Sequence, residues 1–344
     1  MKEQRLHYID IAKGFLILMV VYGHIDGTAT QMGFVNSSID DIHKGANWFV
    51  SFYMPCFFVI TGYCSNFTKS FKVFIVASLK SIVLPAFVFS FLLSGAWIII
   101  HPGFLLNFVI TFILYGGNYW FLSALFVSRL LYWFIYRLPI SANAAICVVS
   151  FIIGFYYSSL PHKYELWWFV HALCLLPYLG LGQLFKQISG NILFKYTKYY
   201  IALYVFLFFI TVGLSKMGLL QKDCFFDVPG VTQGFINLNL TMFIPLFILS
   251  VSGSLAILGF SEYISSNHIL EFLGKNSLVI YCVQGLALKF SIAFISQMGG
   301  ADFDNNYFLT LTLLLFSFII AVIACSIISW IMNLNYLRYA IGKF

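Results

Sequence analysis

Long apolar runs, each close to the length of a membrane span, alternate along the chain with short polar segments. A helix needs about 20 apolar residues to cross the hydrocarbon core of a bilayer. The lengths of these runs and the charges between them predict an all-α, polytopic membrane bundle of about ten helices. Their expected bounds are 8–27, 46–65, 74–100, 119–137, 140–158, 165–185, 199–218, 238–260, 276–296 and 307–333. Because no polar segment is long enough to fold by itself, we expect residues 1–344 to form a single transmembrane domain.

One segment, 104–117, is apolar but short, and it ends in Gly116-Gly117-Asn118. Counting it as a span would give eleven helices and would move every later loop to the opposite side of the membrane. We therefore interpret it as a re-entrant or interfacial segment on the outer side, a kind that persists only when buried in protein or lining a cavity. An eleventh short helix is the competing interpretation.

The basic residues sort by side of the membrane if the N-terminus is cytoplasmic. The cytoplasmic helix ends would then carry Lys2, Arg5, Lys69, Lys72, Arg137, Lys186, Lys195, Lys198, Lys275, Arg338 and Lys343. The opposite loops would carry Lys44, Lys163, Lys216 and Lys222, together with most of the acidic residues. This asymmetry follows the positive-inside rule and predicts that both termini are cytoplasmic.

Composition agrees with a membrane protein, because 61% of the residues are hydrophobic and only 9% are charged, against about 25% charged in soluble domains. The net charge of +7 comes from scattered cations, so no nucleic-acid partner is expected. The seven cysteines show no metal-binding spacing. Those within apolar runs are interpreted as buried thiols, namely Cys56, Cys64, Cys147, Cys174, Cys282 and Cys325.

The first helix carries three ionisable residues, Asp10, Lys13 and His24. Lys13 and His24 are eleven residues apart, which is about three turns, so both lie on one stripe of the helix about 16 Å apart. His24 is the natural general base for a hydroxyl, and Lys13 suits the phosphate of an incoming cofactor. Asp10 can pair with Lys13 on the same face. Taken singly, each residue also fits a purely structural role. Lys13 could extend its ammonium group to the membrane interface, Asp10 could be its partner at the surface, and His24 could be an interfacial polar residue.

Four motifs, taken in order, resemble the membrane acyltransferase-3 family, in particular the branch related to fucose 4-O-acetylases. The first is Asp-x-x-Lys-Gly at 10–14 with Val-x-Gly-His at 21–24, and the second is Phe-x-Met-Pro-x-Phe-Phe-x-x-Thr-Gly-Tyr at 52–63. The others are the Trp-Phe-Leu helix start within 118–125 and Gly-Lys-x-Ser-Leu-x-Ile-Tyr within 272–281. Thr61-Gly62, inside the second motif, is also typical of close contacts between membrane helices.

The resemblance implies transfer of an acyl group, commonly acetyl from acetyl-CoA, to sugar hydroxyls of bacterial surface glycans. It makes His24 the catalytic histidine, Lys13 the basic position of the first helix and Asp10 the acidic position before it. Two positions depart from the branch, because Tyr53 precedes Met-Pro where histidine is frequent, and Gln284 follows the Ile-Tyr segment where histidine is again frequent. Neither side chain acts as a base near neutral pH. Both can form hydrogen bonds, and we expect both to contact substrate.

Further candidates follow from position within the predicted spans. Arg129 is a cation inside the fourth span and is either a CoA phosphate ligand or part of a structural ion pair. Asn118 and Trp120 open that span on the outer side, and Glu165 and His171 begin the sixth. We expect these four to contact the sugar, whereas Trp167-Trp168 is interpreted as part of the interfacial aromatic belt.

The sequence thus predicts a multi-pass O-acyltransferase of the bacterial inner membrane, acting on acyl-CoA and a sugar or glycan acceptor without a metal. The lipid bilayer is the other expected partner, and a homodimer is the oligomeric state considered. The alternative is a transporter or flippase for a small metabolite or lipid-linked sugar, which would favour paired charges in matched halves of the chain. A sensor or scaffold would leave the Lys13–His24 stripe without a purpose.

Overall fold

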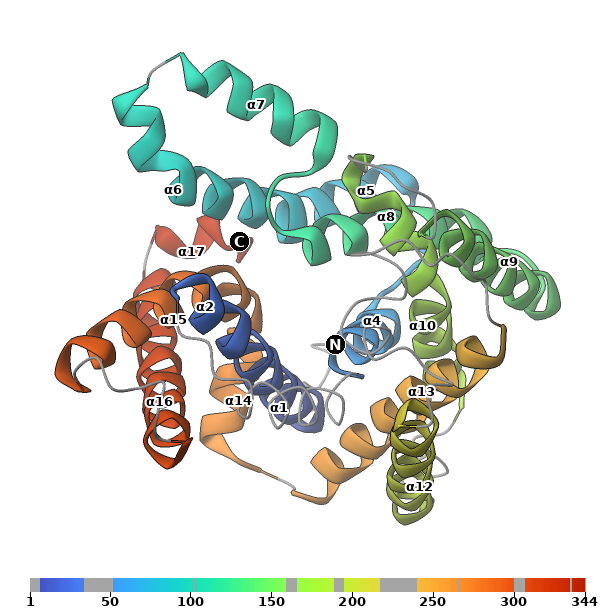
Figure 1. The fold of residues 1–344 in the computed structure, drawn as a ribbon. Helices are drawn as coiled ribbons and strands as arrows, with labels where there is room; N and C mark the ends of the chain where they lie inside the picture. The colour runs from blue at the N-terminus through green and yellow to red at the C-terminus, as the bar shows by residue number, and fades with distance from the viewer. Residues whose placement is uncertain are drawn as a thin grey trace. The chain divides into compact units, whose positions relative to one another are not determined.

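The computed structural model describes residues 7–33, 52–101, 103–158, 166–188, 195–216, 240–264, 266–299, 307–334 and 336–343. Every regular element in these ranges is a helix (Figure 1), as the apolar pattern predicts. The chain divides into two compact units, which are described separately. The first comprises Met1–Tyr53 and Phe260–Arg338, and the second comprises Met54–Gly259 and Tyr339–Phe344.

The predicted number of about ten spans is not confirmed. Within the described residues, six helices are long and apolar enough to cross a membrane, and a bent pair of helices brings the number to seven. The other predicted spans correspond to shorter apolar helices, Tyr53–Cys64, Thr197–Ile210 and Phe247–Tyr263.

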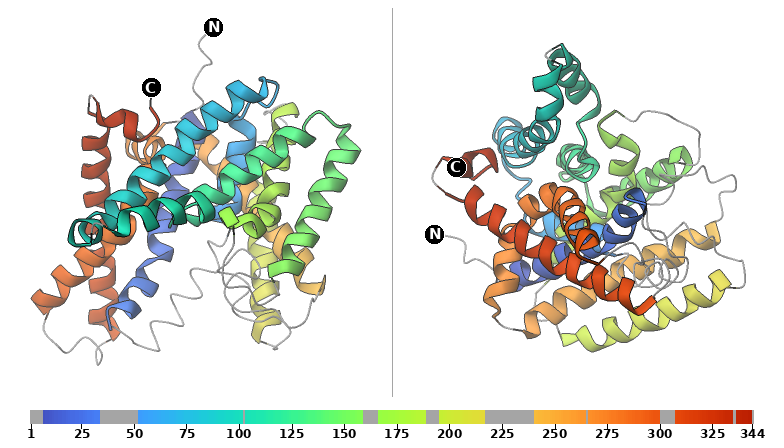
Figure 2. Two further views of the ribbon diagram at one scale, coloured as in Figure 1. Left: turned by 90° about the horizontal axis from the view of Figure 1, so that it is seen from above. Right: turned by 60° about the vertical axis from the view of Figure 1, so that its left-hand side comes forward.

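The described part of the first unit is built mainly from five helices. Its helices are α1 (His7–Gly23), α2 (Ile25–Gln31), α14 (His268–Lys275), α15 (Ser277–Gly299) and α16 (Tyr307–Met332). Helix α1 packs on α14 and α15, and α15 packs on α16, which can be followed in the two further views of Figure 2. The predicted first span is thus two helices, and α14 is a short helix that the sequence pattern does not predict.

The second unit contains most of the remaining helices. They are α4 (Tyr53–Cys64), α5 (Phe71–Ser78), the π-helix η1 (Leu79–Val83), α6 (Leu84–Ile100), α7 (Phe104–Tyr115), α8 (Trp120–Ile135), α9 (Ile140–Ser158), the 3₁₀-helix η2 (Leu166–Trp168), α10 (Phe169–Gln187), α12 (Thr197–Lys216) and α13 (Leu240–Tyr263). Helix α10 packs on both α8 and α9. A last short helix, α17 (Leu337–Ala340), ends the described chain.

The segment predicted to be re-entrant is helix α7, which is followed by a sharp turn. Gly116 and Gly117 both have positive φ (81° and 78°), a conformation that glycine adopts without steric cost. The turn sets α7 at 44° to α8, so the pair forms either one broken span or a re-entrant loop with a span. The re-entrant assignment therefore stays a prediction.

Close contact at Gly62, which the Thr61-Gly62 pair predicts, occurs between α4 and α10. A methyl group at Gly62 would overlap the carbonyl oxygen of Leu179, and one at Gly182 would overlap that of Val59. The amide of Gln183 donates to the carbonyl oxygens of Gly62 and Ser65 at this crossing. Of the six cysteines expected to be buried thiols, five are buried, and Cys64 at the end of α4 is exposed instead.

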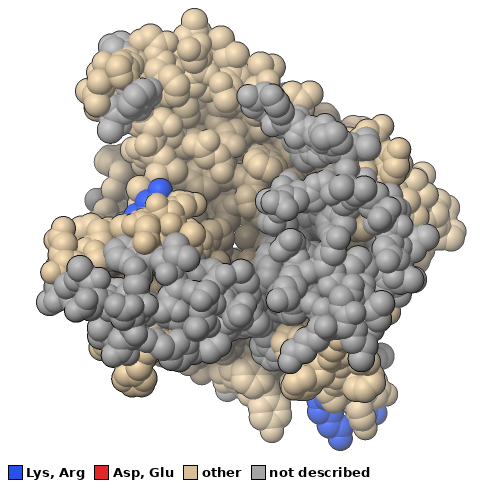
Figure 3. Space-filling model, viewed as in Figure 1, with Lys and Arg blue, Asp and Glu red and all other residues tan. Residues whose placement is uncertain are grey.

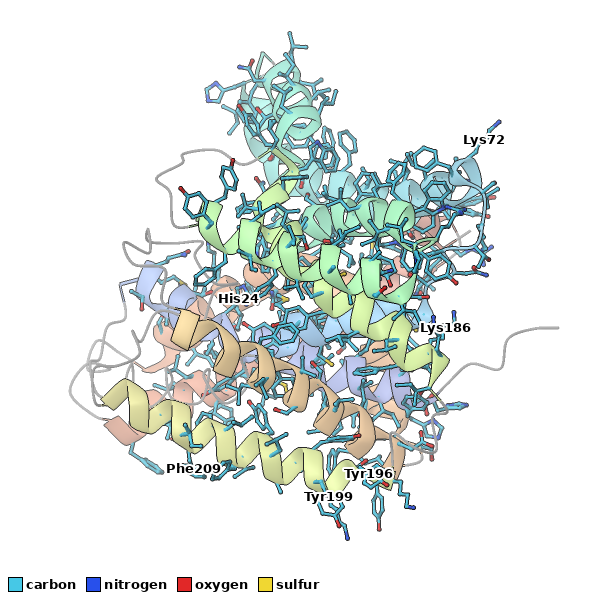
Figure 4. The ribbon with its side chains drawn as sticks, turned by 90° about the vertical axis from the view of Figure 1, so that its right-hand side faces the viewer. His24, Lys72, Lys186, Tyr196, Tyr199 and Phe209 are labelled. Atoms are coloured by element: carbon cyan, nitrogen blue, oxygen red, sulfur yellow. The ribbon has the colours of Figure 1, made fainter. Side chains whose placement is uncertain are left out.

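Basic side chains gather at one end of the second unit. In Figure 4, Lys72 and Lys186 lie toward the same side as Tyr196, and Phe209, further along α12, lies toward the opposite side. Arg137 stacks on Trp133 (4.0 Å from its guanidinium carbon to the ring centroid), and the Trp133 indole N–H donates to the Lys69 carbonyl. On the face in Figure 3, the described part of the surface shows Lys and Arg atoms only in small spots.

Candidate functional site

The first and the fourth sequence motifs meet in the first unit, where α1 crosses α14. A side chain at Gly14 would overlap the backbone carbonyl of Leu270, and one at Gly274 would overlap that of Asp10. Two glycines from motifs about 260 residues apart in sequence therefore let the helices touch backbone to backbone. This crossing fixes the helix that carries the candidate catalytic residues.

Asp10 and Lys13 lie at this crossing but do not pair as expected. Asp10 is buried (4% exposed), and Lys13 is half-buried. Among the described residues, Lys13 makes no ion pair or hydrogen bond. A half-buried ammonium group that no carboxylate neutralises can attract an anion.

The carboxylate that does form ion pairs here is Glu271 of α14, which the sequence did not single out. It accepts from the Lys275 ammonium at 2.8 Å and lies 3.1 Å from Nδ1 of His7 at the start of α1. These contacts lower the pKa of Glu271 to about 2, and the contact with Lys275 makes the largest contribution. The only sequence signal was the Glu271–Lys275 spacing of four residues, which places both on one helix face.

His24 occupies the joint between α1 and α2, marked in Figure 4. Its Nδ1 lies 2.8 Å from the carbonyl oxygen of Val20. Because a carbonyl oxygen can only accept, Nδ1 carries the hydrogen, and Nε2 keeps the lone pair that a base requires. The Thr28 hydroxyl donates to the His24 carbonyl at 2.7 Å and secures the joint from the α2 side. The His24 side chain is exposed.

The predicted stripe from Lys13 to His24 is consistent with this geometry. Helix α1 is uninterrupted from Lys13 to Gly23, and His24 follows with near-helical backbone angles (φ −94°, ψ −7°). Helical geometry therefore holds from Lys13 to the residue before His24, so the expected separation of about 16 Å between Lys13 and His24 along the helix axis applies closely.

Gln284 on α15 is a second polar side chain in the first unit with an unusual environment. It is 4% exposed, and its Oε1 atom is buried without a hydrogen-bond partner. Helix α15 packs against both α1 and α2, which meet at His24. A buried acceptor without a donor is destabilising, and a bound donor would satisfy it.

Tyr53, the other departure from the motifs, is half-buried at the start of α4.

The second unit brings together two of the residues expected to contact sugar. The ring centroids of Trp120 and His171 are 5.2 Å apart, and Trp168 lies 4.9 Å from His171 and 6.5 Å from Trp120. We call these three residues the aromatic cluster. Asn118 is exposed in the turn before α8, and Glu165 lies outside the described residues.

Arg129 lies nine residues beyond Trp120 on α8, about 13 Å along the helix. Its guanidinium carbon is 5.2 Å from the ring centroid of Phe74, and its Nε is buried without a hydrogen-bond partner. Among the described residues it forms no ion pair, so the structural alternative has no support there. No group of three or more His, Cys, Asp or Glu residues that could hold a metal occurs in the same ranges.

In the part of the chain that the structure describes, every regular element is a helix, several helices are long and apolar enough to cross a membrane, and the first ends next to a histidine, so the fold is that of a membrane-embedded helical protein. A family profile described as an acyltransferase domain matches residues 6–330, nearly the whole chain. The protein belongs to the acyltransferase-3 family. Searches of curated proteins and of solved structures gave no match.

Proposed function

We propose that this acyltransferase moves an acetyl or another short acyl group from acyl-CoA to a sugar hydroxyl. The acceptor is a bacterial surface glycan or its lipid-linked precursor, as in the fucose 4-O-acetylase-related branch that the motifs resemble. The observation that carries the proposal is the Nδ1–H bond of His24 to Val20, because it leaves Nε2 able to take a proton.

The chemistry follows from that tautomer. Nε2 of His24 removes the proton from the sugar hydroxyl as the oxygen attacks the thioester carbonyl carbon. The carbon–sulfur bond then breaks, and the leaving CoA thiolate recovers the proton from the imidazolium. The products are an acyl ester of the sugar and free CoA. The imidazole ends in its starting form, and the bond to Val20 holds the ring in place throughout.

The donor is proposed to bind along α1. The ammonium group of Lys13, without an ionic partner among the described residues, would attract a CoA phosphate. The pantetheine arm would follow the stripe, so that its thioester reaches His24 about three turns away. Arg129 is a second candidate for phosphate, and Asp10 is proposed to help keep α1 in place.

The orientation belongs to the same proposal. The basic end of the second unit, with Lys72 and Lys186, is proposed to face the cytoplasm, where acyl-CoA is made. The protein would then lie in the inner membrane with both termini cytoplasmic.

The experiment is acyl transfer by purified protein in nanodiscs, with CoA release and acylated sugar measured by mass spectrometry. Released CoA should not be measured with a thiol reagent, because the free cysteines of the chain would react with that reagent as well. We expect His24→Ala to lower transfer by about 10²–10⁴-fold, the usual contribution of a general base. His268→Ala removes another exposed imidazole in the same unit and should leave the rate unchanged. Near-normal transfer by His24→Ala would refute the role of His24.

A further inference from the structure

Two consecutive tryptophans before α10 have left-handed backbone angles. Trp167 has φ 53° and ψ 28°, and Trp168 has φ 54° and ψ 43°. They are the positive-φ residues other than glycine in the described chain. Bulky side chains rarely adopt this region, because it is sterically strained, and such strain persists where the surroundings enforce it, often at functional sites.

The unusual backbone sends the two indoles to different neighbours. Trp167 is anchored, because its N–H donates to the Ile113 carbonyl at 2.9 Å and its ring packs on Phe112 and Phe126. Trp168 instead joins the aromatic cluster with Trp120 and His171. The contacts of Trp167 thus hold Trp168 in a left-handed backbone conformation that a tryptophan would otherwise rarely adopt.

The aromatic cluster has a closed side and an open side. His171 is 2% exposed, whereas Trp120 and Trp168 are half-buried and so leave part of each indole uncovered. Membrane-belt tryptophans need only an interfacial position and an ordinary backbone. Two indoles brought together on a buried imidazole, at the expense of backbone strain, indicate a binding surface instead.

The cluster also lies where an extracytoplasmic ligand would arrive. His171 precedes Lys186 by fifteen residues on α10, about 22 Å along the helix. Lys186 lies at the basic end of the unit in Figure 4. The cluster is therefore at the opposite end, away from the side proposed for CoA.

We propose that Trp120 and Trp168 form a carbohydrate-binding subsite, in which their indole faces stack on the C–H face of a pyranose ring. The electron-rich ring face attracts the slightly positive C–H groups, and His171 forms the fixed base of the surface. This inference rests on the proposed function, because it states where the acceptor sugar is held.

The test uses full-length protein in nanodiscs, without glycoside detergents that would compete. The probes are the methyl glycosides of fucose, glucose and galactose, observed by saturation-transfer NMR. Wild type should transfer saturation to the ring protons of at least one probe. Trp120→Leu and Trp168→Leu should each weaken that binding several-fold, up to about tenfold, because each removes one of the two aromatic faces. Trp168→Phe keeps an aromatic face and should restore much of it.

The matched control is Trp330→Leu, which removes a 60% exposed tryptophan from α16 and should leave binding unchanged. Should a leucine variant fail to fold, Trp168→Gly relaxes the left-handed backbone, and it must still lose the probe. No binding of any probe by wild type, or equal binding by all variants, would overturn the inference.

Two results separate this inference from the proposed function. If glycosides bind through the cluster but CoA is never released with any of them, the subsite stands and the transfer proposal fails. If transfer proceeds with an unchanged acceptor KM in both leucine variants, the transfer proposal stands and the subsite is wrong.

Discussion

Gly274 of α14 lies directly against the backbone carbonyl of Asp10 in α1, with no room for a side chain between them. In the same way, Gly14 of α1 lies directly against the backbone carbonyl of Leu270 in α14. The crossing is therefore reciprocal, and α14 acts as a rigid support for the helix that ends at His24. The late Gly-Lys motif is explained by this packing, because its glycine positions α1.

We expect Gly274→Ala to destabilise the protein and to lower its activity. The added methyl group meets backbone atoms that cannot rotate away, and overpacking of this kind typically costs about 1–3 kcal/mol. Thermal unfolding in nanodiscs measures the loss. Gly95→Ala is the control, since a methyl group there would meet nothing within 4 Å. An equal melting temperature for Gly274→Ala and wild type would show that the helices can separate without penalty.

The helical class, the presence of membrane-length apolar helices and the helix that carries the first motif could be predicted from the sequence, because apolar length is a local signal, whereas the number of about ten spans is not confirmed. Helix α14 was not predicted, since His268–Lys275 is far shorter than a membrane span, and its close packing on α1 at Gly14 and Gly274 joins segments that are distant in sequence. The break between α1 and α2 at His24 was not predicted either, because the expected first span, 8–27, was taken as one helix through this residue.

The aromatic cluster shows a different limit. Trp120 and His171 were predicted separately as sugar contacts, but Trp168 was assigned to the membrane belt. Local preference opposes a left-handed tryptophan, so nothing in the sequence around 167–168 indicates the turn that brings Trp168 to His171. Tertiary contacts of Trp167 with α7 and α8 decide it.

Thr28→Val should lower kcat a few-fold without changing the KM for acetyl-CoA. The variant keeps the shape of the side chain but removes the hydroxyl that donates to the His24 carbonyl, a bond worth about 0.5–1.5 kcal/mol. Thr28→Ser should restore the rate. Thr312 makes the same bond to Phe308 on α16, so Thr312→Val is the matched control and should behave as wild type. A change confined to KM would mean that Thr28 acts on donor binding.

Lys13→Ala should raise the KM for acetyl-CoA by roughly 10–100-fold, the range for a lost hydrogen bond to a charged group. Lys13→Arg should recover part of it, because the charge remains. The decisive comparison uses acetyl-pantetheine, which lacks the phosphates, and with this donor wild type and Lys13→Ala should have similar KM values. A defect of the same size with both donors would place Lys13 away from the phosphates.

Acid should remove the stabilising contribution of the Glu271 carboxylate, which contacts Lys275 on α14 and His7 on α1. The pKa of Glu271 is lowered to about 2 from its ordinary value near 4.5. Its contribution to stability is therefore fully present above about pH 4.5 and is lost as the pH falls toward 2. The difference in melting temperature between wild type and Glu271→Gln, measured over this range, should shrink as the pH falls. A difference that stays constant would exclude the ionised carboxylate as its source.

Gln284→Met should raise the melting temperature and lower the transfer rate at once. The glutamine has a buried oxygen without a donor, a state that costs about 1–3 kcal/mol, and methionine fills the space without that penalty. If a substrate donates to Gln284, the same change removes a contact needed in the bound state. Gln183, equally buried, donates to two carbonyl oxygens, so Gln183→Met should instead destabilise. A stabilised Gln284→Met with full activity would limit the glutamine to a structural role.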